Sequence, residues 1–132
     1  KNMQIKILRI LTVVFAVVSI VACSSGIAGK WTVQKYETIN IGEQGATLHN
    51  IGTIEFFKDG TGTKNLTFGF VGEELRDSTP LRWAKSGDKY ITIESNGSEL
   101  SKIWIIVKDK GNYQKWQSTD GINRVQTLEL KR

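Results

Sequence analysis

From Gly29 onward, apolar and polar residues alternate with a period of two, in short stretches rich in Val, Ile, Thr, Tyr, Phe and Trp. Gly, Asn and Asp interrupt these stretches. A period of two is typical of strands with one buried face, and no stretch of ten or more residues has a convincing helical period of 3.6. The pattern therefore predicts an all-β domain. Its eight expected strands are 30–39, 51–58, 61–70, 81–85, 89–95, 102–108, 113–118 and 125–131.

The connections between these strands alternate in length. Three are tight, at 58–60, 85–88 and 108–112, and each contains the Gly or Asn that a hairpin turn needs for positive φ. The intervening connections are mostly longer. An up-and-down antiparallel meander then has its tight turns at one end and its long loops at the other. Eight such strands can close into a small barrel without unpaired edges, and we expect this barrel to be closed at one end and open at the other.

The N-terminal segment has a different character. Lys1, Lys6 and Arg9 precede an apolar run over residues 10–22, and the first carboxylate is Glu37. A membrane-spanning helix needs about 18 to 20 apolar residues, so this shorter run fits the core of a secretory signal better. The sequence predicts a signal peptide over 1–22.

The segment Ile20-Val21-Ala22-Cys23 resembles the bacterial lipobox. The resemblance implies that Cys23 becomes the lipid-anchored first residue of the mature protein, tethered to the domain through 23–28, so that one partner is the lipid bilayer. Ser24 follows the cysteine and no acidic run does, which by analogy with sorting rules favours the outer membrane, facing the periplasm. Cys23 is the only cysteine, which excludes an intrachain disulfide and a thiolate metal cluster.

Charge excludes one class of partner. Removal of the signal takes away three basic residues and no acidic ones, so the formal net charge falls from +5 to +2. A nucleic-acid-binding domain would carry a clustered basic face. We therefore expect no nucleic-acid partner.

Gly29-Lys30-Trp31 resembles the Gly-x-Trp signature of lipocalins. It is also similar to the start of short lipocalin-like lipoproteins of Bacteroidetes-type bacteria, whose meander ends near a Leu-x-Leu strand, as in Leu128-Glu129-Leu130. The resemblance implies a lipocalin-like barrel over 29–132. A barrel of eight strands is just wide enough either to be filled by side chains or to hold one small ligand. Independently of the family, Gly29 and Trp31 are expected to form a structural plug at the closed end, beside the last strand.

Aromatic residues near the strand ends are candidates for a ligand-binding mouth at the open end. These residues are Phe70, Trp83 and Trp116. Below them we expect Ile54, Phe56 and Leu66 to fill the barrel. Arg82 or His49 could orient a carboxylate head group, although both fit solvated surface positions better.

The expected strand 102–108 is apolar on both faces, in Ile103-Trp104-Ile105-Ile106-Val107. One interpretation is that a loop or the tether covers Trp104 and Ile106. The other is that this strand carries a surface for a protein partner, because exposed apolar patches tend to mark interaction sites.

Catalytic and metal-binding patterns are weak. The run from Asp59 to Lys64 resembles a glycine-rich phosphate loop but lacks the order Gly-Lys-Ser/Thr and a following helix, so it is expected to be a hairpin turn. His49 has no second His or Cys to complete a metal site. Glu73, Glu74 and Asp77 beside Arg76 indicate a solvated loop. The sequence therefore predicts no enzyme, no cofactor and no metal.

Two functional hypotheses follow. The first is an outer-membrane-anchored, lipocalin-like protein that binds a small hydrophobic or amphipathic ligand at the open end of the barrel. The second is an interaction or structural lipoprotein with a side-chain-filled barrel that docks a protein partner.

Overall fold

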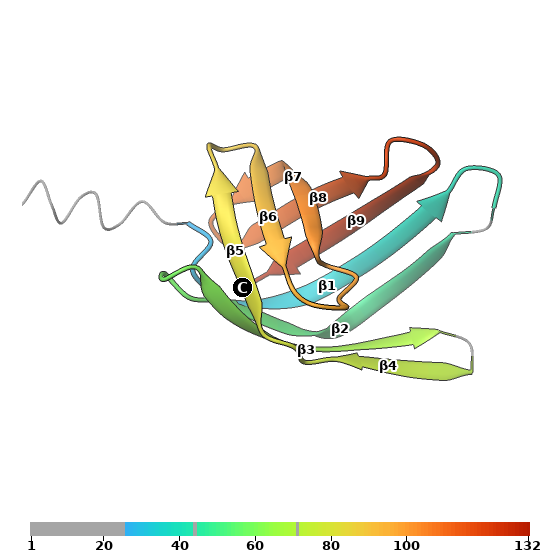
Figure 1. The fold of residues 1–132 in the computed structure, drawn as a ribbon, viewed down its shortest axis with the longest axis horizontal. Helices are drawn as coiled ribbons and strands as arrows, with labels where there is room; N and C mark the ends of the chain where they lie inside the picture. Colours follow the sequence, from blue (N-terminus) through green and yellow to red (C-terminus); the bar gives the residue numbers. More distant parts are fainter. Residues whose placement is uncertain (1–25, 44, 71) are drawn as a thin grey trace, which may run out of the picture.

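The computed structural model describes residues 26–43, 45–70 and 72–132, without the side chain of Phe70 (Figure 1). The expected signal peptide 1–22 and Cys23 lie outside these residues. The described part of the chain forms nine β-strands and no helix, and none of it forms an apolar helix long enough to cross a membrane. The strands are β1 (Gly29–Asn40), β2 (Ala46–Phe56), β3 (Thr61–Phe70), β4 (Glu73–Asp77), β5 (Leu81–Ser86), β6 (Tyr90–Glu94), β7 (Lys102–Lys110), β8 (Tyr113–Thr119) and β9 (Arg124–Lys131).

Eight of these strands form the barrel that the alternation predicts. Each of β1, β2, β3, β5, β6, β7, β8 and β9 pairs antiparallel with the next, and β9 pairs back with β1. The closing ladder is long, from Thr32 opposite Lys131 to Asn40 opposite Arg124. The all-β class and the up-and-down meander are therefore confirmed.

The ninth strand, β4, corrects the expectation that 71–80 is a loop. β4 pairs only with β3. Both β4 and β5 pair with β3 in the same register, with Leu66 opposite Asp77 and Gly62 opposite Leu81. Thus β4 and β5 follow one line along β3, with pairing interrupted at residues 78–80. Pro80 lies within this interruption and has no N–H to donate to a ladder. The result is one long strand broken in the middle.

Large side chains occupy the barrel interior. Trp31, Trp104 and Trp116 are each 0% exposed. The ring centroid of Trp116 lies 6.0 Å from that of Phe56 and 6.5 Å from that of Trp104. Ile54 and the other two residues expected to fill the barrel, Phe56 and Leu66, are buried. These buried side chains form one hydrophobic core inside the barrel.

The two ends of the barrel are covered in similar ways. At the end with the tight turns, buried Ile27 lies under the barrel, and the Trp31 indole N–H donates to the Ile27 carbonyl at 2.8 Å. At the end with the long loops, buried Leu100 takes the same position, and the Trp104 N–H donates to its carbonyl at 2.9 Å. The end that was expected to be open is therefore covered by the β6–β7 loop.

Candidate functional site

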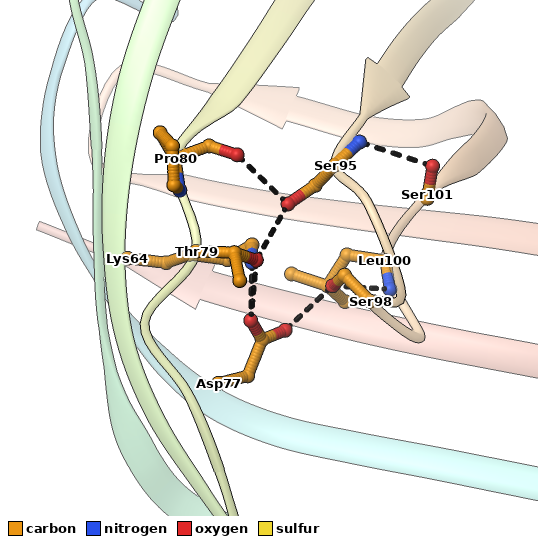
Figure 2. Close-up of polar contacts among 8 residues, drawn as sticks. All are labelled: Lys64, Asp77, Thr79, Pro80, Ser95, Ser98, Leu100 and Ser101. Atoms are coloured by element: carbon orange, nitrogen blue, oxygen red, sulfur yellow. Dashed lines mark hydrogen bonds and ion pairs between the residues drawn. The ribbon is translucent and has the colours of Figure 1, made fainter.

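The break between β4 and β5 contains a buried lysine. Lys64 is on the inward face of β3, and its side chain is 0% exposed. Its ammonium forms an ion pair with Asp77 and donates to the Thr79 hydroxyl at 2.6 Å (Figure 2). Because an uncompensated buried charge is very unfavourable, these partners are what allows a lysine at this position.

The same cluster attaches the β6–β7 loop to the break. The Ser98 hydroxyl donates to the second oxygen of Asp77 at 2.5 Å and accepts the Leu100 N–H at 3.1 Å. The Ser95 hydroxyl donates to the Pro80 carbonyl at 3.0 Å (Figure 2). Leu100 is therefore held over the barrel interior by contacts that begin at Asp77.

The electrostatics of Asp77 reflect this position. Burial raises the pKa of its carboxyl, but the hydrogen bonds from Lys64, Ser98 and Thr79 together with the positive charge of Lys64 outweigh burial, so that the pKa is lowered from its ordinary value. Asp77 is thus ionised at neutral pH and accepts bonds from three side chains. This cluster neutralises itself and acts as a structural clamp.

A second polar chain lies at the other side of the same loop. Lys102, just after the loop, donates to the Gln126 amide oxygen, and the Gln126 amide group donates to the Tyr36 hydroxyl at 2.7 Å. Burial and the nearby Glu99 carboxylate raise the pKa of Tyr36 to about 12, although Gln126 and Arg124 oppose the shift. Burial is also the main cause that lowers the pKa of Lys102. Tyr36 therefore stays neutral at physiological pH and is a poor candidate for proton transfer.

At the closed end, Arg132 clamps the N-terminal segment to the barrel. Its guanidinium carbon lies 4.3 Å from the Trp31 ring centroid. The same group donates to the Ala28 carbonyl at 3.0 Å, the Gly26 carbonyl at 2.9 Å and the Gly111 carbonyl at 2.7 Å. Residues 26–28 are therefore held beside the β7–β8 turn.

Gly29 contributes to this end through its backbone. It has a φ of 134°, which residues with a Cβ rarely adopt, and a Cβ there would lie 3.1 Å from the Arg132 guanidinium. Trp31 lies beside β9, where Val33 pairs with Leu130 and Tyr36 with Leu128. The structure thus places Gly29 and Trp31 at the closed end.

The three candidates for a binding mouth do not meet at one opening. Trp116 lies in the centre of the core. Trp83 is half-buried on the other side of Phe56, with the two ring centroids 5.7 Å apart, and its N–H lies within hydrogen-bonding distance of the Phe57 and Thr61 carbonyls. Phe70 is at the far end of the β3–β4 hairpin. The exposed His49 on β2 is remote from Trp83 in the ladder.

A groove lies outside the barrel, across the strand break. Its volume is about 690 Å³, and Gly62 and Leu81, which are both buried, contribute to its lining. Arg82 and the exposed ring of Phe57 also line it. The remaining lining residues are Thr61, Thr63, Pro80, Glu94, Ser95, Asn96 and Ser101. Arg82, which the sequence suggested as a partner for a carboxylate, is thus at an outer groove.

The strand that is apolar on both faces, β7, divides its side chains between the core and the surface. Trp104 is in the core and Ile106 packs against it, so neither needs a separate cover. The outward residues Ile103, Ile105 and Val107 are the exposed ones. Whether a partner covers this face stays a prediction.

The remaining motifs behave as surface structure. Asp59 accepts hydrogen bonds from the Thr61 N–H and hydroxyl, as part of the β2–β3 hairpin. No group of three or more His, Cys, Asp or Glu side chains that could hold a metal occurs in the described part of the chain. Sequence reasoning missed the Lys64–Asp77 pair. The sequence did contain a sign of it, because Lys64 is two residues from Leu66 and its side chain therefore points into the barrel as that of Leu66 does.

Asp77→Asn should destabilise the barrel by roughly 2 to 4 kcal/mol at neutral pH, because Lys64 loses its counter-charge. The pKa of Asp77 is lowered by folding, so its stabilising contribution exists above the unfolded value near 3.8 and is lost as pH falls through the lower folded value. Urea unfolding of both proteins from pH 7 to pH 2 should therefore show the difference shrinking below about pH 4.

Asp59 and Asp120, whose pKa values are also lowered, are present in both proteins, so they do not contribute to that difference. The double variant Lys64→Met/Asp77→Asn is the control, since an apolar replacement of a buried pair is often neutral. A constant difference down to pH 2 would contradict this account.

Comparison with known proteins adds nothing to what the fold shows about this chain. No protein-family model, curated protein or solved structure matches it. The resemblance to lipocalin-like lipoproteins therefore stays a prediction that depends on the residues quoted for it. The structure itself establishes a small eight-stranded β-barrel with one additional strand.

Proposed function

We propose that this chain is a non-enzymatic outer-membrane lipoprotein whose barrel is a rigid support for docking a protein partner. The observation that carries this proposal is the packed interior, with three fully buried tryptophans, the N-terminal segment at one end and the β6–β7 loop at the other. An interior packed in this way favours docking on the outside of the barrel over ligand binding within it. The contacts of the buried Lys64 and of the half-buried Lys102 support a structural role as well, because their polar groups are directed at one another.

The docking surface that we propose is the tip formed by the β1–β2 and β8–β9 loops. Ile41 and Ile122 are 73% and 83% exposed there. The Ile41 N–H donates to the Asn123 carbonyl at 2.8 Å, which joins the two loops. The Asp120 carboxylate accepts three backbone N–H groups, from Ile122 at 2.9 Å and from the next two residues at 3.1 Å. The isoleucines are thus held outward on preorganised loops, which reduces the entropy cost of binding.

The position of the tip favours a protein as its occupant. The described chain enters at the closed end, and the tip lies at the opposite end (Figure 1). β1 has 12 residues between them, which at about 3.3 Å per residue is roughly 35 to 40 Å. A domain anchored through 23–28 would present this tip away from its own membrane. An apolar pocket on another envelope protein is the complementary surface.

A second candidate function is binding of an amphipathic carboxylate in the outer groove. The observation that favours it is the combination of an apolar floor at Leu81, an exposed aromatic ring at Phe57 and the cationic Arg82. Such a mixture is typical of ligand sites, which are mainly apolar with a few orienting polar groups. On this hypothesis the ligand binds beside the strand break and leaves the core unchanged.

Cys23 should incorporate a labelled fatty-acid analogue, because it is the only thiol and follows the only long apolar run. Cells that produce the full chain should yield labelled protein in the membrane fraction. The Cys23→Ser variant should lose the label. Label and membrane fractionation that persist in the variant would show that the anchor is elsewhere.

A photo-crosslinking residue at position 122 should give one discrete protein adduct in cells, since Ile122 is the most exposed apolar side chain of the tip. Ile41→Asn in the same chain should weaken this adduct several-fold without lowering stability, because surface changes rarely alter stability by more than about 0.5 kcal/mol. The same crosslinker at the exposed Thr32 is the control. Equal adducts at both positions would contradict docking at the tip.

Fatty acids should produce a saturable change in tryptophan fluorescence below about millimolar concentration if the second function applies, because Trp83 lies next to the groove-lining Arg82 and bonds to groove-lining carbonyls. Arg82→Gln should weaken binding about tenfold or more. Arg76→Gln, on β4 outside the groove, is the matched control. No saturable change up to millimolar would remove this candidate.

A further inference from the structure

We infer that the outer face of β6 and β7, at the end of the barrel from which the tether leaves, is a second membrane contact that lies on anionic lipid head groups. This inference rests on the proposed lipid anchor for its orientation. On this inference, lipid covers the face of β7 for which the sequence suggested a protein partner.

The apolar part of this face consists of four exposed residues on two paired strands. Tyr90 of β6 lies directly opposite Ile105 of β7, and Ile103 lies one step further along the same face. Val107 joins them through a β-bulge, because the register of β7 against β8 shifts between Ile106 and Lys108. A bulge re-aims a side chain out of the ladder. Val107 is accordingly exposed beside Ile105.

Lysines flank these apolar residues in the sequence. Within residues 84–91 and 105–115 there are five lysines and two aspartates, which leaves three positive charges. Lys85 and Asp109 pair with each other at 3.7 Å. The other four lysines form no ion pair with a carboxylate among the described residues; Asp88 is the remaining acid of these two segments, and Glu129 of β9 lies opposite Lys115. These four are Lys89, Lys108, Lys110 and Lys115.

A rim of free lysines around exposed apolar side chains is complementary to one kind of surface. Exposed lysines close to an anionic bilayer are attracted to its negative potential, while apolar and aromatic side chains enter the boundary between head groups and acyl chains. A typical protein docking surface has a different composition, because lysine is depleted there. Charge complementarity therefore favours an anionic lipid surface.

The position of the N-terminal segment favours this face as the one turned toward the membrane. Arg132 bonds to Gly26 and Ala28 of the N-terminal segment and to Gly111 in the turn between β7 and β8. Gly26, the first residue that the structure describes, is therefore held beside the turn that follows Lys110. A lipid on Cys23 would hold the lysine rim close to the bilayer, where basic residues are attracted to anionic head groups.

The test uses the full chain with Cys23→Ser, so that a single introduced thiol carries an environment-sensitive dye. The dye is placed at Val107→Cys or, as a matched control, at Ile122→Cys on the opposite end. Each protein is mixed with vesicles of phosphatidylcholine alone or with added phosphatidylglycerol, with and without brominated lipids as quenchers.

We expect the dye at position 107 to shift to the blue and to be quenched in phosphatidylglycerol vesicles at low salt, and the dye at 122 to remain unchanged. Lys89→Gln/Lys108→Gln/Lys110→Gln should lower the partition coefficient at least about tenfold, because each lysine near the surface contributes. High salt should have the same effect.

Three results would overturn the inference. The dye at 107 could stay unshifted in phosphatidylglycerol vesicles, in which case this face does not touch lipid; because the tested chain lacks Cys23, this result leaves the proposed anchoring unaffected. The dye at 122 could respond instead, which would place the tip in the membrane. A shift at 107 without vesicles, accompanied by a dimer in size-exclusion chromatography, would make a second copy the occupant. Failure of the anchor itself is detected separately, as loss of Cys23 labelling in cells.

Discussion

The pairing of β9 with β1 is the interaction on which the rest of the structure depends. It joins the two ends of the meander, and its ladder extends over most of both strands. Closure gives every barrel strand two neighbours and leaves an interior narrow enough to be filled by side chains. The same pairing brings Arg132, just after β9, to Trp31 near the start of β1. The closed end and the exit path of the N-terminal segment are therefore consequences of closure.

The barrel wall has one weak place, and buried polar groups compensate for it. Along β3, the ladder to β4 and β5 is interrupted at residues 78–80, and β5 contributes two residue pairs to β3. Lys64, Asp77 and Thr79 occupy this interruption with side-chain contacts in place of backbone pairing. A buried ion pair adds little net stability compared with apolar packing. The ion pair instead positions the β6–β7 loop. Asp77 also accepts a hydrogen bond from the Ser98 hydroxyl, and Ser98 in turn accepts the N–H of Leu100.

The fold was accessible to sequence reasoning because it depends on local signals. Alternation and tight turns mark the strands, and the order of short and long connections gives the meander. Non-local pairing was not accessible in the same way. Glu73–Asp77 has no apolar alternation and forms β4 only because β3 offers an extended partner. The position of Leu100 was not accessible either, since nothing near it in the sequence indicates that this residue turns into the barrel.

The remaining differences between the sequence prediction and the structure concern which side chains of a strand point into the barrel. Trp116 and Phe56 were assigned to different layers, yet both point inward and meet in the core. In β7, alternation puts Trp104 inward and Ile103 and Ile105 outward, so that an apolar strand serves two environments. Burial of the first set is explained by the core. The core does not explain why Ile103 and Ile105 are exposed, because a face in contact with water would favour polar residues. Nearby strands do have polar residues on this face, with Arg82 on β5 and Gln117 on β8. The outward isoleucines are therefore a departure from the pattern of the rest of the barrel wall, and such a departure calls for a surface that removes them from water.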